Sequence, residues 1–94
     1  MENVFNLTFP KADTSVAGYP FGRITFAEQV EDKIDYSRQI TIVFPDNIKM
    51  VASSFIQGFF ETIVQNIGLR GVEERVIIKS SSERLSEKIK RNIR

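Results

Sequence analysis

The fold class of this chain is decided by one stretch, Ile40-Thr-Ile-Val-Phe44-Pro-Asp-Asn-Ile-Lys-Met-Val-Ala-Ser-Ser-Phe-Ile-Gln-Gly-Phe-Phe60. It begins with a dense run of β-branched residues, Ile40–Phe44, which predicts an interior strand covered on both faces. Pro45 stops that strand, and an amphipathic helix follows after a short loop. The stretch therefore reads as strand, loop and helix, the repeating unit of α/β proteins.

The helix in this stretch has the strongest pattern in the chain. Ser54 and Gln57 have the spacing of a capping box, which predicts that the helix begins at Ser54. Gly68 predicts its end. The apolar residues between them recur in steps of four and one, as a broad helical stripe requires, and they are Phe55, Ile56, Phe59, Phe60, Ile63, Val64 and Ile67. We expect the middle of this stripe, from Phe59 to Ile63, to be buried.

On the N-terminal side, two further elements are predicted. Apolar and polar residues alternate over Asn3–Phe9, which predicts a half-buried edge strand. Residues 10–23 contain two prolines and two glycines and are expected to form a loop. Thr25 and Glu28 then form a second capping box, which predicts a short helix with Phe26 and Val30, followed by Ile34, on one face.

On the C-terminal side, the alternation continues. Glu74–Lys79 predicts another buried strand, and Ser80 and Glu83 form a third capping box. Leu85, Ile89 and Ile93 follow at helical spacing. We therefore predict one domain over residues 1–94, an α/β fold with a small single-layer sheet of about four strands, mixed or mainly parallel, and three helices.

Composition narrows the classes of function. The 94 residues include no cysteine and no histidine, which removes disulfides, thiolate nucleophiles, Cys/His zinc sites and histidine-based acid–base triads. No phosphate-binding glycine motif, metal site or paired catalytic carboxylates stand out, so we expect neither an enzyme nor a bound cofactor. No leader segment and no long apolar run are present, which predicts a cytoplasmic protein outside the membrane.

The net charge of +1 hides an asymmetry. Residues 1–69 hold five Lys/Arg against eight Asp/Glu, or −3, whereas residues 70–94 hold eight against four, or +4. A nucleic-acid-associated accessory domain is therefore an alternative function, and the side chains that would serve it are Arg84, Lys88, Lys90, Arg91 and Arg94. The favoured interpretation is that these cations complement the negative end of the last helix, because no aromatic residues are interleaved with them.

Two serines stand where the main helix begins. If Ser54 caps the helix, Ser53 lies just outside it, and a phosphate there would be stabilised by the helix dipole and free backbone N–H groups. The plainer interpretation is that Ser53 and Ser54 serve only as caps, which is the commonest role of serine before an apolar helix.

Three short motifs, in this order, carry a family resemblance. They are Phe21-Gly-Arg-Ile-Thr25, the strand Ile40–Phe44, and Ser53-Ser-Phe55. Together they resemble a STAS-like bacterial domain family of unknown function, and more distantly the STAS domains of anti-sigma-factor antagonists, over roughly residues 19–93. The resemblance implies a STAS-like fold.

The resemblance also implies a function. It places Ser53 at the position of the regulatory phosphoserine of the antagonists, and it gives Arg23 and Thr25 a structural role. We expect Arg23 to hold the 10–23 loop by bonding backbone carbonyls or an acid such as Asp46. The expected function is a non-enzymatic regulatory protein–protein interaction module. Its implied partner is a histidine-kinase-like ATPase or an anti-sigma-like regulator, and its oligomeric state stays open, a homodimer included.

Overall fold

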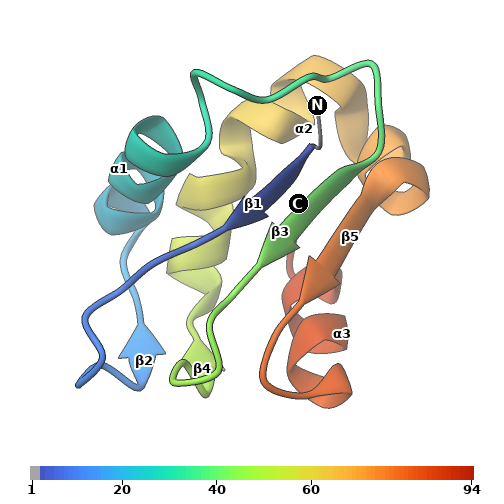
Figure 1. Cartoon of the computed structure of the whole chain (residues 1–94). Helices are drawn as coiled ribbons and strands as arrows, with labels where there is room; N and C mark the ends of the chain where they lie inside the picture. Colours follow the sequence, from blue (N-terminus) through green and yellow to red (C-terminus); the bar gives the residue numbers. More distant parts are fainter. Residues whose placement is uncertain (1–2) are drawn as a thin grey trace.

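The computed structural model of the chain describes residues 3–94 and contains five short strands in two parallel sheets (Figure 1). The main sheet has the order β1-β3-β5, and its strands are β1 (Val4–Asn6), β3 (Ile40–Val43) and β5 (Val76–Lys79). A separate two-stranded sheet pairs β2 (Ser15–Val16) with β4 (Met50–Val51). The predicted α/β class is confirmed, but the strands are divided between two sheets instead of forming one sheet of about four.

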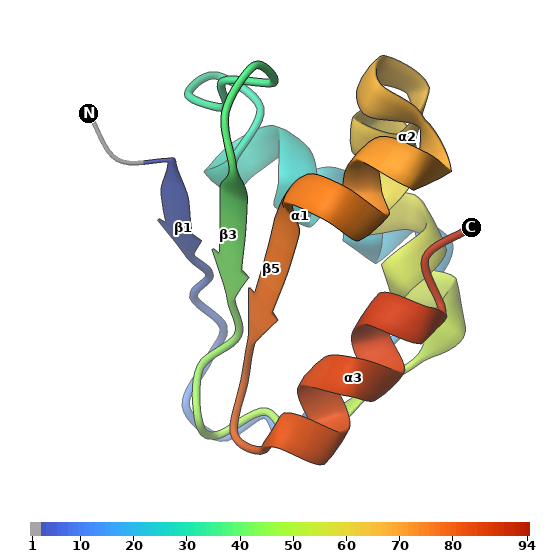
Figure 2. The ribbon, with the colours of Figure 1, turned by 90° about the vertical axis from the view of Figure 1, so that its right-hand side faces the viewer.

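Three helices complete the part of the fold that residues 3–94 form, and Figure 2 shows them on one side of the main sheet. They are α1 (Tyr19–Gln29), α2 (Ser53–Arg75) and α3 (Glu83–Arg91). The prediction that β3 is a buried interior strand is confirmed, since Ile40, Thr41 and Ile42 are each at most 7% exposed. The register puts Thr41 between Val4 and Ile77, and it is these two residues of the flanking strands β1 and β5 that are exposed.

The core lies between the sheet and the helices. The strands contribute Phe5, Ile42 and Val76 to it, and the apolar stripe of α2 packs against them. The predicted burial of Phe59, Phe60 and Ile63 is confirmed, since each is at most 1% exposed. This packing of a helical stripe on a sheet face supplies the apolar burial that drives folding.

The first helix begins six residues earlier than its predicted cap. Tyr19 opens α1, and Pro20 occupies its first turn, where a missing backbone N–H costs nothing. Thr25 therefore lies inside the helix and caps nothing; its buried hydroxyl donates to the Phe21 carbonyl at 2.8 Å. Residues 10–23, predicted to be a loop throughout, therefore contain a loop, strand β2 and the first turn of α1.

The other two capping boxes are also displaced. Helix α2 begins at Ser53, after Ala52, so Ser54 lies in its first turn instead of capping it. In α3 the cap is Ser82, whose hydroxyl accepts from the Leu85 N–H at 3.1 Å, and the predicted cap Ser80 lies outside the helix.

Gly68 interrupts α2, as its position at the end of the stripe predicts. Its φ of 74° and ψ of 169° are non-helical, and a second helical segment continues to Arg75 before β5 begins. These backbone angles are tolerated by glycine because it lacks a Cβ atom.

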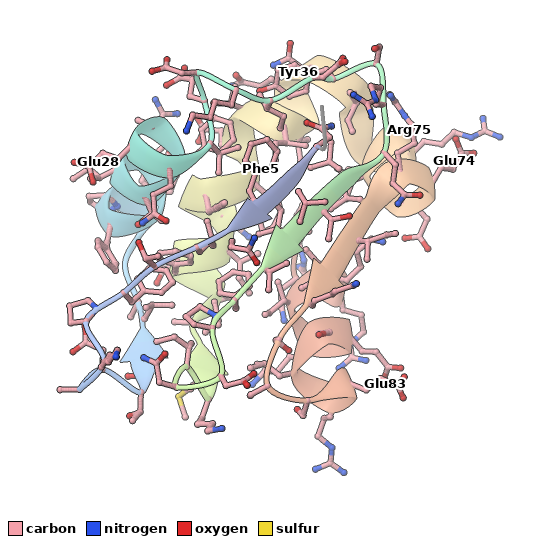
Figure 3. The ribbon with its side chains drawn as sticks, in the orientation of Figure 1. Phe5, Glu28, Tyr36, Glu74, Arg75 and Glu83 are labelled. Carbon is pink, nitrogen blue, oxygen red and sulfur yellow. The ribbon has the colours of Figure 1, made fainter. Side chains whose placement is uncertain are left out.

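The end of the fold where β3 starts is closed by hydrogen bonds to backbone carbonyls. The buried Asn3 side chain donates to the carbonyls of Asp35 and Gln39 at 2.8 and 2.9 Å, and its oxygen accepts from the Asp35 N–H. Arg75 donates to the Tyr36 carbonyl at 2.5 Å, and Figure 3 shows both residues at this end, far from Glu83. The connection from α1 to β3 is thus fixed at several points.

Candidate functional site at the carboxyl ends of the strands

The opposite end of the molecule collects the chemically interesting residues. The strands of the main sheet are parallel, and the next helix along the chain comes after β2, after β4 and directly after β5. The carboxyl ends of the strands and the N-termini of the helices therefore lie together, at the lower end of Figure 1. In open α/β sheets, ligands bind beyond the carboxyl ends of the strands. We therefore take this end as the candidate site.

The two serines singled out from the sequence lie here and differ in their surroundings. Ser54 is exposed, and its hydroxyl accepts from the Gly18 N–H at 3.0 Å, which ties the start of α2 to the start of α1. Ser53 is also exposed as the first residue of α2, and within residues 3–94 its hydroxyl makes no hydrogen bond. Ser53 is thus sterically open, while Ser54 has a structural role.

Arg23 has a different partner from the predicted one. It lies on α1 and forms an ion pair with Glu61 of α2, with Nη1 and Oε2 2.5 Å apart. The Tyr19 hydroxyl donates to the other oxygen of Glu61, and this hydrogen bond raises the pKa of Tyr19 above its ordinary value. Arg23 therefore joins two helices, and the proposed contact with Asp46 or with loop carbonyls is absent among the described residues.

This geometry predicts a modest contribution from Arg23. Its side chain is 48% exposed, and exposed ion pairs typically contribute about 0.2–1 kcal/mol. In a double-mutant cycle of Arg23→Ala and Glu61→Ala, followed by urea unfolding, we expect a coupling energy in that range. A coupling near 3 kcal/mol would contradict this, because it would require a desolvated pair.

The predicted basic surface is divided by α3 into separate regions. Arg84 and Lys88, one turn apart, face β4, whereas Glu83 and Glu87 line a different hollow of about 320 Å³ beside β5. Lys90 lies with these acids, and its ammonium donates to the Val76 carbonyl at 2.5 Å.

The two remaining cations of the predicted surface, Arg91 and Arg94, are exposed and line neither hollow. The five cations are therefore not all gathered in one hollow.

The cations that face β4 are joined by one that sequence reasoning missed. They line a hollow of about 210 Å³, here called the basic hollow, and its lining residues are Lys49, Met50, Val51, Ser82, Arg84, Leu85 and Lys88. Lys49 and Met50 are held in place because their backbone N–H groups both donate to the Thr14 carbonyl, at 2.7 and 3.2 Å. No sequence signal links Lys49 to Arg84, since only the tertiary fold brings β4 beside α3.

Among residues 3–94, no group of three or more carboxylates, histidines or cysteines is placed to hold a metal ion. No helix in the described part of the chain is long and apolar enough to cross a membrane.

Comparison with protein-family models, with curated proteins and with solved structures finds no match to this chain.

Proposed function

We propose that this chain is a non-enzymatic regulatory interaction module that docks a protein partner through the end of the fold around Ser53. The observation that carries the proposal is that most of the exposed large apolar side chains of the described chain come from elements that begin at this end. Seven large apolar residues are exposed in the described chain, and four of them lie on α1 and β4 at or next to this end: Tyr19, Phe21, Ile24 and Met50. Exposed apolar patches on soluble domains commonly mark protein–protein contacts.

The apolar side chains from α1 are held against the start of α2. The Phe21 ring centroid lies 5.5 Å from that of Phe55, two residues after Ser53, and 6.0 Å from that of Phe9. Phe21 nevertheless remains 40% exposed. An aromatic side chain that is already ordered loses little conformational entropy when a partner covers it, which favours its use at an interface.

The nature of the partner is proposed from the family resemblance. Two of the three motifs that carry it are in contact, because Gly22 packs on the backbone of Phe55 and the Phe21 ring packs on the ring of Phe55. This contact supports treating Phe21–Thr25 and Ser53–Phe55 as one functional unit. The proposed partner is a histidine-kinase-like ATPase or an anti-sigma-like regulator in a bacterial cytoplasm, with phosphorylation of Ser53 as the switch.

A photo-crosslinking amino acid tests the docking surface. Placed at Ile24, one of these exposed apolar residues at 51% exposure, it is expected to yield an adduct in cells with a protein that mass spectrometry identifies. The same amino acid at Gln39, at the opposite end of β3, is expected to yield none. Equal adducts from both positions, or no protein adduct from Ile24, would overturn the proposed function.

The switch is tested by Ser53→Asp. We expect the variant to fold with unchanged or slightly raised stability, because a negative charge in the first turn of a helix contributes about 0.3–1 kcal/mol favourably. Its affinity for the cross-linked partner should change, since a charge is added within the docking surface. Gln39→Glu makes the same change of charge at the far end and should bind as the wild type does. Equal affinities for all three proteins would exclude the switch.

A further inference from the structure

We infer that the basic hollow binds an acidic segment of the protein partner, with one apolar side chain of that segment in the hollow and its carboxylates against Lys49, Arg84 and Lys88. The inference rests on the proposed function and deepens it, because it gives the chemistry of what the partner presents. It is carried by three features of the hollow, namely its charge, its apolar floor and its place beside Ser53.

The charge of the hollow is of one sign. Its three ionisable lining residues are all cations, and two of them come from α3 while the third comes from the segment entering β4. Within residues 3–94, no carboxylate forms an ion pair with Lys49, Arg84 or Lys88. Cations that converge from separate elements repel one another, and an anionic ligand would relieve that repulsion.

The acids of α3 do not offset this charge inside the hollow. Glu83 and Glu87 line the other hollow, beside β5. Helix α3 thus presents Glu83 and Glu87, together with Lys90, to β5, and only cations to β4. Because no carboxylate lines the basic hollow, it favours ligands with carboxylates over ligands with amines.

The floor of the hollow is apolar. Val51 and Leu85 are 3% and 8% exposed, while Met50 is 61% exposed at its rim. Methionine side chains are flexible and adapt to varied apolar partners. An apolar floor surrounded by cations suits a peptide that carries an apolar side chain among acidic ones, and it is more than an inorganic anion needs.

Nucleic acid fits the hollow less well. Its lining contains no aromatic side chain on which a base could stack. Lys90, which would extend the cationic surface, is occupied at the Val76 carbonyl. The cationic region is therefore short, whereas binding along a phosphate backbone uses many contacts.

The place of the hollow gives the proposed switch a direction. Met50 and Val51 line it, and Ser53 follows two residues later. A negative charge at Ser53 would repel the carboxylates of a segment bound beside it. Phosphorylation, or Ser53→Asp, is therefore expected to weaken binding of the acidic segment.

Selection from a phage-displayed library of random short peptides tests the inference. The triple variant Lys49→Glu, Arg84→Glu, Lys88→Glu reverses the charge of the hollow. Its matched control, Lys33→Glu, Arg91→Glu, Arg94→Glu, changes the net charge equally at exposed positions that do not line it. A neutral triple, with glutamine at 49, 84 and 88, guards against misfolding, and thermal unfolding verifies each protein.

We expect the wild type and the control to select peptides that combine Asp or Glu with a large apolar residue. A selected peptide, labelled with fluorescein, should bind the glutamine triple at least about tenfold more weakly than the wild type. It should show no measurable binding to the glutamate triple. Selection of uncharged or basic peptides, no selection, or equal weakening in the control would overturn the inference. So would a DNA duplex that binds the wild type and is lost with the hollow variants while no acidic peptide is selected.

Failure of this inference and failure of the proposed function are distinguishable. If Ile24 gives an identified adduct but no acidic peptide is selected, the proposed interaction module is supported and the acidic segment is refuted. If there is neither an adduct nor a selected peptide, both are refuted.

Discussion

Replacing Gly58 by alanine is expected to destabilise the fold by about 3 kcal/mol or more, at the upper end of the usual cost of overpacking. A Cβ atom at Gly58 would lie 2.1 Å from the carbonyl oxygen of Tyr19 and 3.2 Å from the backbone nitrogen of Arg23. Both atoms belong to the backbone of α1, so no side chain can rotate away. The helices would have to separate, and the roughly 1 kcal/mol of helix propensity that alanine adds is too small to compensate.

The measurement is urea unfolding followed by circular dichroism. Gln57→Ala, at the exposed neighbouring position of α2, is the control and should change the free energy of unfolding by less than about 0.5 kcal/mol. Gly22→Ala tests the same crossing from α1, since its Cβ would lie 2.3 Å from the Phe55 carbonyl oxygen. Wild-type stability of Gly58→Ala would mean that α1 and α2 are further apart than the structure places them.

Truncating Phe59 to alanine is expected to cost about 3–5 kcal/mol, the usual range for a fully buried phenylalanine. Phe59 is 0% exposed, and its ring centroid lies 4.8 Å from that of Phe60 and 5.6 Å from that of Phe26. The substitution would remove the ring through which α2 contacts both α1 and its own next residue, and it would leave a cavity. For a domain of this size, such a loss is a large part of the total stability.

Phe21→Ala is the matched control for this prediction. Phe21 is 40% exposed in the proposed docking surface, so its truncation should cost clearly less than that of Phe59. Unfolding by urea measures both. If the two costs were equal, or if Phe59→Ala cost less than about 1 kcal/mol, the stripe of α2 would not be the centre of the core.

The positions of helix starts were the least predictable feature. Three capping boxes satisfied the sequence rule, yet none of their first residues caps a helix: Thr25 and Ser54 lie inside helices, and Ser80 lies before the cap of α3. A serine or threonine three residues before Glu or Gln is a local signal, and a hydroxyl takes whichever partner the packed fold offers. The Ser54 hydroxyl accepts a hydrogen bond from the Gly18 N–H, a contact that no local rule can predict.

Part of the candidate site was predictable and part was not. Ser53 could be located because the apolar stripe of α2 sets where the helix lies, and its first turn falls beside the carboxyl ends of the strands. Lys49 and Met50 could not be located, because neither belongs to a motif. They contribute to the basic hollow only because β4 pairs with β2 and lies next to α3.

The sequence by itself determined the strands of the main sheet and the approximate places of the helices, but not β2 and β4. Periodicity was sufficient to predict the strand at Ile40–Phe44 and the helix with the stripe from Phe55 to Ile67. In each segment the apolar residues can be buried together only in one type of secondary structure. Tertiary structure alone decided which residues remote in sequence meet: Gly22 with Phe55, Arg23 with Glu61, and Lys49 with Arg84. The physical reason is that local pattern reports which face of an element is apolar, whereas the partner of that face depends on how all the elements pack at once.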